Sequence, residues 1–228
     1  MNFNKHSELK GSHALFSPSQ SAWLRYDDDK IRDRIRNQYR TQLGTELHEY
    51  VAQQITLNHK VTNLRSVVSG IENYIYTKYR IADESKTSGF GMTLLQHVGT
   101  LPKEVFETAR MYINDGIAFG MTVEQPLVYS DVCFGTADTI SFREDQKLLR
   151  ISDYKSGDHP ASMDQVITYA ALFFLEYTIK PRDVKIELRI YQSGEINYAE
   201  PETDEIEDAM GIIINVNRIA ERVKAKEG

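Results

Sequence analysis

Two aspartates and a lysine lie close together in the central part of the chain. Asp138 falls within residues 132–142, where β-branched and aromatic residues predict a strand. Asp153 and Lys155 end a second apolar run at 148–155, and the short polar stretch between the runs suits a hairpin. Carboxylates on neighbouring strands can converge on one hard divalent cation. Because Lys155 projects from the same strand face as Asp153, this pattern predicts a metal site with a lysine beside it to steer a water molecule.

The elements around this hairpin predict an α/β fold with added helices at both ends. Segments with apolar residues at helical spacing predict helices, and segments rich in β-branched and aromatic residues predict strands. The pattern predicts helices at 17–26, 45–55, 64–79 and 103–119, strands at 122–129, 132–142 and 148–155, a helix at 163–177, strands at 183–191 and 196–199, and a final helix at 204–224. Pro126 predicts that the first strand lies at a sheet edge, and residues 81–91 predict a loop.

The length of 228 residues suits one structural domain with a sizeable core. Within it we expect a flexible lead at 1–15, a helical part at 16–121, a sheet-bearing core at 122–200, and an acidic segment with the C-terminal helix at 201–228.

The order of the polar residues resembles the PD-(D/E)xK nuclease superfamily, and within it the RecB-like exonuclease branch. The motifs of that branch are matched by Gly135 with Asp138, by Asp153-Tyr154-Lys155, and by Gln165 with Tyr169. Upstream, Gly44-Thr45-Glu46-Leu47-His48 resembles the histidine-bearing helix of the branch, and Phe16-Ser17-Pro18-Ser19 with Trp23-Leu24 resembles its N-terminal signature, including that of phage and prophage members. The resemblance covers residues 12–192 in the right order.

This resemblance implies a PD-(D/E)xK core, a small mixed β-sheet flanked by helices, that binds Mg²⁺ or Mn²⁺. The implied metal ligands are His48, Asp138, Asp153 and the backbone carbonyl of Tyr154, with Glu124 as a further ligand or an acid that supports the metal site. The implied catalytic set is Asp138, Asp153, Lys155, Gln165 and Tyr169. Gln165 and Tyr169 are also implied to contact DNA.

Each of these residues has an ordinary structural alternative. His48 lies beside an apolar stripe, where a histidine packed at the edge of the core is common. Gln165 and Tyr169 share one helix face, so Tyr169 also fits a core position with Gln165 at the surface. Glu124 also fits an exposed glutamate of an edge strand. The basic residues Arg32, Arg34 and Arg36 suit phosphate contacts, and they equally suit a solvated helix or loop.

Other cofactors and chemistries are not expected. Cys133 is the single cysteine, so the chain lacks the four thiolates of the iron–sulfur cluster that several RecB-like nucleases hold. The chain also has no glycine-rich phosphate loop, no Cys/His zinc spacing and no His-Glu-x-x-His motif.

The net charge of the chain is −6, whereas many nucleic-acid-binding proteins carry an excess of basic residues. Six acids between residues 200 and 208 account for this value, so the rest of the chain is about neutral. No apolar run approaches the ~20 residues of a membrane helix, and the first ten residues lack the apolar core of a secretory signal. We therefore expect a cytoplasmic protein of a bacterial or phage-infected cell, with no membrane partner.

The sequence thus predicts a divalent-metal-dependent DNA nuclease, an exonuclease acting in recombination, repair or phage DNA metabolism. Two alternatives stay open. One is a non-catalytic or partner-activated subunit that binds DNA or protein with the same fold, and the other is a structure- or sequence-specific endonuclease. The expected partners are DNA, a second copy of the chain and a recombination protein.

Overall fold

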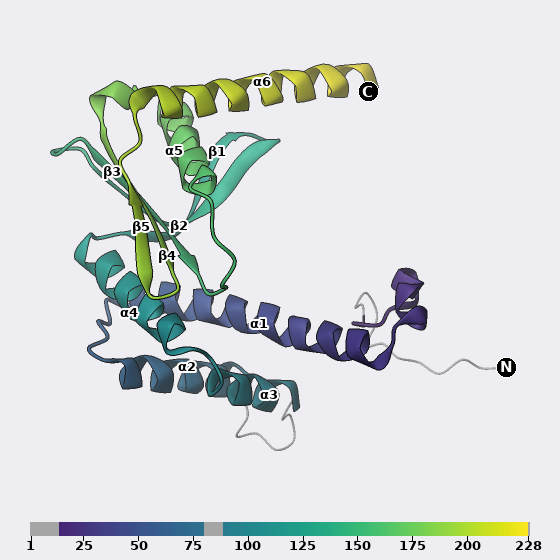
Figure 1. Ribbon diagram of the computed structural model, residues 1–228. Helices are drawn as coiled ribbons and strands as arrows, with labels where there is room; N and C mark the ends of the chain where they lie inside the picture. Colours follow the sequence, from purple (N-terminus) through teal and green to yellow (C-terminus); the bar gives the residue numbers. More distant parts are fainter. Residues whose placement is uncertain (1–13, 80–88, 228) are drawn as a thin grey trace.

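A computed structural model describes residues 14–79 and 89–227 (Figure 1). Most of the predicted lead at 1–15 and most of the predicted loop at 81–91 lie outside the described residues. No helix within the described ranges is long and apolar enough to cross a membrane.

A mixed sheet forms the centre of the fold, and its five strands follow the order of the chain. They are β1 (Thr122–Ser130), β2 (Cys133–Arg143), β3 (Leu148–Lys155), β4 (Lys185–Gln192) and β5 (Glu195–Ala199). Neighbours pair antiparallel except for β3 and β4, which are parallel. A parallel pair needs a crossover, and α5 (Asp164–Tyr177) provides it. The predicted mixed sheet is confirmed, and β1 lies at an edge as Pro126 predicts.

Helices cover both faces of the sheet (Figure 1). On one face lie α5 and the long C-terminal helix α6 (Thr203–Glu227). The other face is covered by α1 (Asp28–Thr56) and α4 (Lys103–Ala118), and α2 (Leu64–Lys78) and α3 (Gly89–Val98) pack on these two helices on the side away from the sheet. A 3-10 helix, η2 (Pro18–Arg25), precedes α1, and a one-turn 3-10 helix, η3 (Pro181–Asp183), precedes β4.

Successive side chains of β3 point to opposite faces of the sheet and belong to two separate hydrophobic clusters. Leu149 and Ile151 point toward α5, whereas Tyr154 points into the helical layer on the other face. Tyr191 of β4 belongs to the same cluster as Tyr154, and its hydroxyl donates to Asp115 Oδ2 of α4 at 2.8 Å. The strand that carries Asp153 is therefore fixed from both sides by buried side chains.

Two helices differ from the sequence prediction. The helix predicted at 45–55 begins at Asp28, and Asp27 caps it by accepting from Lys30 N at 2.9 Å. Its first half carries mostly charged residues, so apolar spacing does not reveal it. The helix α3 was not predicted at all. Gly89 and Gly91 disfavour a helix, but burial of Leu94 and Val98 against the helical core outweighs that local cost.

Candidate active site

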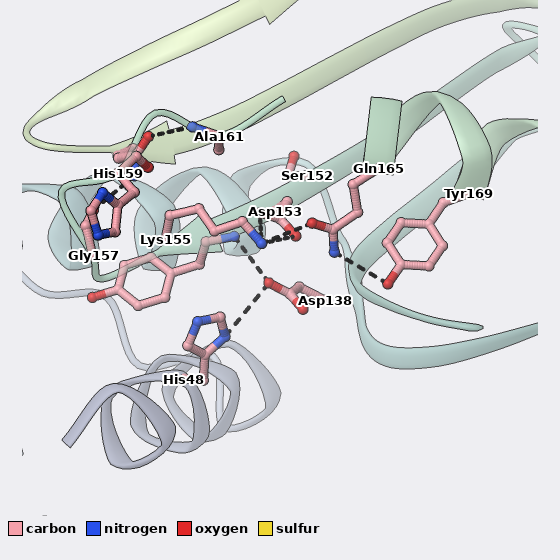
Figure 2. Close-up of polar contacts among 12 residues, drawn as sticks. His48, Asp138, Ser152, Asp153, Lys155, Gly157, His159, Ala161, Gln165 and Tyr169 are labelled. Carbon is pink, nitrogen blue, oxygen red and sulfur yellow. Dashed lines mark hydrogen bonds and ion pairs between the residues drawn. The ribbon is translucent and has the colours of Figure 1, made fainter. Parts of the chain in front are cut away.

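The site lies where β2 and β3 separate. Their ladder ends at Thr139 opposite Ser152, and both strands continue beyond this pair. Past it, the backbone N–H of Tyr154 donates to Asp138 Oδ2 at 3.0 Å instead of to a backbone carbonyl. The carboxylate of Asp138 therefore bridges the two strands directly beside Asp153 (Figure 2).

Asp153 is the buried centre of a polar chain that runs across to α5. Its side chain is only 2% exposed, and Lys155 Nζ lies 2.9 Å from Oδ2 and 3.2 Å from Oδ1. The same ammonium donates to Gln165 Oε1 at 2.9 Å, and Gln165 Nε2 donates to the hydroxyl of Tyr169 at 3.3 Å. Figure 2 shows these side chains in a row, so the structure brings the predicted motif residues of β3 and α5 into contact.

Gly135 of β2 lets Tyr169 lie against the strand. A Cβ built on Gly135 would come within 2.9 Å of Tyr169 Cε1, closer than carbon atoms pack. The glycine of the predicted Gly-x-x-Asp motif thus has a steric reason, because a side chain there would push the tyrosine ring away from Gln165.

We expect Gly135→Ala to displace the Tyr169 ring and to lower the DNA hydrolysis that the motif resemblance implies by roughly 10- to 100-fold, because small misplacements in a site have effects of this size. Overpacking should also cost about 1–3 kcal/mol of unfolding free energy. Gly157→Ala is the matched control, since a Cβ there meets nothing within 4 Å. Steady-state rates and urea unfolding of both variants test this; equal effects of the two substitutions would contradict it.

His48 approaches the site from α1. Its Nδ1 lies 3.6 Å from Asp138 Oδ2, beyond hydrogen-bond distance, and its ring meets the Tyr154 ring edge-on at a centroid separation of 5.0 Å. Burial lowers the pKa of His48. The imidazole is therefore neutral at neutral pH, which is the form that binds a metal.

A buried ionic network holds this part of α1 in place. Glu46 is fully buried and accepts hydrogen bonds from Lys78 Nζ and the Tyr79 hydroxyl, both at 2.7 Å. Lys78 also contacts Glu49, which accepts from the Tyr74 hydroxyl. Glu46 and Glu49 flank His48 in the sequence, so their ties to α2 fix the turn of helix that presents the histidine.

Glu124 of β1 lies opposite Asp138, between the paired residues Val123–Thr139 and Gln125–Ala137. Its φ of 49° is in the left-handed region, which costs a non-glycine residue about 1 kcal/mol or more. The side chain is exposed and lines the same pocket as Asp138 and His48. The structure thus brings Glu124 to the site, where strained backbone is commonly found.

A pocket of about 840 Å³ opens between α1 and the sheet. Its lining includes Arg40, Gly44, His48, Glu49, Glu124 and Asp138. Three of the lining residues are acids, Glu49, Glu124 and Asp138, and Arg40 is the one cationic residue in the lining. A site of this composition attracts a divalent cation, whose charge would offset the carboxylates.

Burial raises the pKa of both aspartates. For Asp153 the pKa rises to about 6, first because the carboxyl is desolvated and second because Asp138 lies nearby; Lys155 acts in the opposite direction. For Asp138 the pKa is raised by desolvation, opposed by the hydrogen bond from Tyr154 N, with a further increase from Glu124. Two ionised carboxylates are therefore held close together at a cost in free energy, which a bound cation would recover.

The raised pKa of Asp153 predicts how stability depends on pH without metal. The folded state binds this proton below about pH 6, whereas the unfolded aspartate, with its ordinary pKa of 3.8, releases it earlier. Stability should therefore fall by roughly 2 kcal/mol as the pH rises from about 4 to 7. Urea unfolding in EDTA should show this slope for the wild type and lose it in Asp153→Asn. A pH-independent difference between the two proteins would contradict the prediction.

The donor set fits a divalent metal, although the side chains do not enclose one. Among residues 14–79 and 89–227, no three His, Cys, Asp or Glu side chains are grouped tightly enough to hold an ion. Yet Asp153 Oδ2 is buried without a properly aligned hydrogen bond, despite its ion-pair contact with Lys155. Carboxylate oxygens with one neutral imidazole suit Mn²⁺ and Mg²⁺, the former better because of the nitrogen ligand.

The three predicted DNA-binding arginines lie near the N-terminal end of α1, three to four helical turns before His48. Arg32 and Arg36 are exposed and lie 3.7 and 3.4 Å from the aspartates one turn before them. Arg34 fastens the preceding segment to α1 by donating to the carbonyl of Leu15 and to Gln20 Oε1. Arg40, which ends the same basic segment of the sequence, lies closer to the site and lines the pocket with His48 and Asp138.

Comparison of the chain with protein-family models, with curated proteins and with solved structures finds no match in any of the three.

Proposed function

We propose that this protein is a divalent-metal-dependent deoxyribonuclease with a PD-(D/E)xK core. The observation that carries this proposal is the junction of β2 and β3. There the Asp138 carboxylate accepts from Tyr154 N, Asp153 lies beside it, and Lys155 connects Asp153 to Gln165. A motif scattered over 32 residues of sequence, from 138 to 169, thus forms one contiguous cluster.

The residues that would hold the ion are His48, Asp138, Asp153 and the carbonyl of Tyr154, with Glu124, which lines the same pocket as His48 and Asp138, as a further acid. A divalent cation at such a site lowers the pKa of bound water and neutralises charge on a phosphate. In the protein itself, Asp138 and Asp153 supply anionic oxygens, and burial keeps His48 neutral.

Lys155 is the residue that acts on the reacting atoms. Its ammonium is held by Asp153 and Gln165, so it reaches the site in a fixed position. From there its third N–H is available to donate to a non-bridging phosphate oxygen, whose negative charge increases in the transition state. Tyr169 keeps Gln165 oriented, and Gln165 is exposed enough to contact the DNA backbone as well.

No side chain in this cluster is a strong nucleophile, so water attacks the phosphorus directly and no covalent intermediate forms. An exonuclease acting on DNA ends, in recombination, repair or phage DNA metabolism, is the activity that the motif resemblance favours. A recombination protein and a second copy of the chain are the proposed protein partners.

Substrate choice tests this proposal. The wild type should degrade end-labelled linear DNA with Mg²⁺ or Mn²⁺ and should leave closed circular DNA intact; separate single- and double-stranded substrates give its strand preference. Cleavage of circles would instead indicate an endonuclease. A folded protein that binds DNA but cleaves neither substrate with either metal would indicate a binding or partner-activated subunit.

A further inference from the structure

The C-terminal helix α6 carries an apolar stripe that nothing in the described part of the chain covers. Its inner side packs on the sheet layer through Ile206 and Ile213. A neighbouring side presents large apolar residues at spacings of four, three and four, which places them on one line along the helix. They are Ile212, Val216, Ile219 and Val223, with exposures of 65%, 48%, 50% and 47%. This spacing is that of the seam between two paired helices.

The charges beside this stripe have a self-complementary order. Asp208 and Arg222 each lie seven residues from Asn215, on the same flank of the stripe, because seven residues are close to two helical turns. Farther out, Asp204 and Lys226 each lie eleven residues from Asn215. All five side chains are exposed. A half-turn rotation about Asn215 therefore exchanges Asp208 with Arg222 and Asp204 with Lys226.

We propose that α6 pairs with α6 of a second copy of this chain, antiparallel, about a two-fold axis beside Asn215. In this arrangement Asp208 lies opposite Arg222 of the partner subunit, and Ile212 packs against Val216 of the partner subunit. Each contact occurs twice, as a two-fold interface requires. A parallel pair would instead place like charges beside each other, which disfavours it.

Within residues 14–79 and 89–227, the contacts of α6 leave this surface free. Lys224 binds Asp131 of the turn between β1 and β2 at 2.6 Å. At 3.6 residues per turn Lys224 lies nearly opposite Asp208 around the helix axis, so this ion pair holds the helix from its other side. Figure 1 places α6 beyond the sheet from α1, so pairing leaves the helix that carries His48 uncovered.

Charge reversal of the full chain tests this inference, with the molar mass measured by sedimentation equilibrium. The wild type should have twice the mass of one chain, and Asp208→Arg and Arg222→Asp should each weaken association at least about tenfold. The double variant should associate again, and an equimolar mixture of the two single variants should form heterodimers. Ile212→Ser should weaken association without any change of charge.

Circular dichroism checks that these surface variants are folded. A wild type that stays monomeric, single variants that associate like the wild type, or a double variant that does not recover would each overturn the inference. Recovery in the mixture but not in the double variant would indicate a parallel pair and would also overturn it. None of these results depends on nuclease activity.

Discussion

Asp153→Asn is expected to lower metal-dependent DNA hydrolysis by at least about a thousandfold, the loss of several kcal/mol of transition-state stabilisation. The carboxylate is almost fully buried between Asp138 and Lys155, and an amide oxygen there carries no charge to hold a cation. The variant should keep its fold, because asparagine has nearly the same shape. It should also lose the increase in melting temperature that we expect Mn²⁺ to give the wild type by binding to the folded state.

Asp158→Asn is the matched control for this substitution. Asp158 lies five residues farther along the chain and is exposed, so its loss should change the rate less than about twofold. Single-turnover rates with Mn²⁺, together with melting curves with and without the metal, measure both effects. If Asp153→Asn retained activity within tenfold of the wild type, Asp153 would not be a metal ligand in the reaction.

Lys155→Met is expected to lower the rate by about 10²- to 10³-fold, the usual loss when one donor to a developing anionic oxygen is removed. Methionine keeps much of the packing volume but donates no hydrogen bond to water or phosphate. Metal binding should survive, because Lys155 is not a ligand. It should become tighter, since the ammonium 2.9 Å from Asp153 no longer competes with the cation.

The two substitutions are therefore expected to separate binding from catalysis. Lys60→Met, at an exposed lysine outside the pocket, is the control for Lys155→Met. Isothermal titration with Mn²⁺ and single-turnover hydrolysis should show retained affinity and a slow rate for Lys155→Met. Weaker metal binding in this variant would assign Lys155 a structural role in place of a catalytic one.

The positions of the strands along the chain were predictable from the sequence because β-branched alternation and polar turns act locally. Asp138, Asp153 and Lys155 were selected in the same way, since each is a charged residue in an otherwise apolar strand, where a charge is costly unless it is paired or bound to a metal. The position of Gln165 beside Lys155 does not follow from helix spacing, which leaves open whether Gln165 faces the site or the solvent; only the motif resemblance implied that Gln165 belongs to the catalytic set.

What was missed depends on contacts between distant segments. The charged first half of α1 has no apolar stripe, so its helical state follows from a cap at Asp27 and continuation into the buried half. The fit of Tyr169 against Gly135 and the ties from Glu46 to α2 link residues far apart in the chain. No local sequence pattern predicts such contacts. The left-handed backbone of Glu124 within a strand is likewise set by tertiary structure.

The most direct measurement is hydrolysis of end-labelled linear DNA by the wild type as a function of divalent metal. The protein is first treated with EDTA, and Mn²⁺ or Mg²⁺ is then added back, with the Asp138→Asn variant in parallel. We expect no cleavage in EDTA, restored cleavage with either metal and none by the variant. Cleavage that persists in EDTA, or equal cleavage by the variant, would contradict a metal-dependent nuclease centred on Asp138 and Asp153.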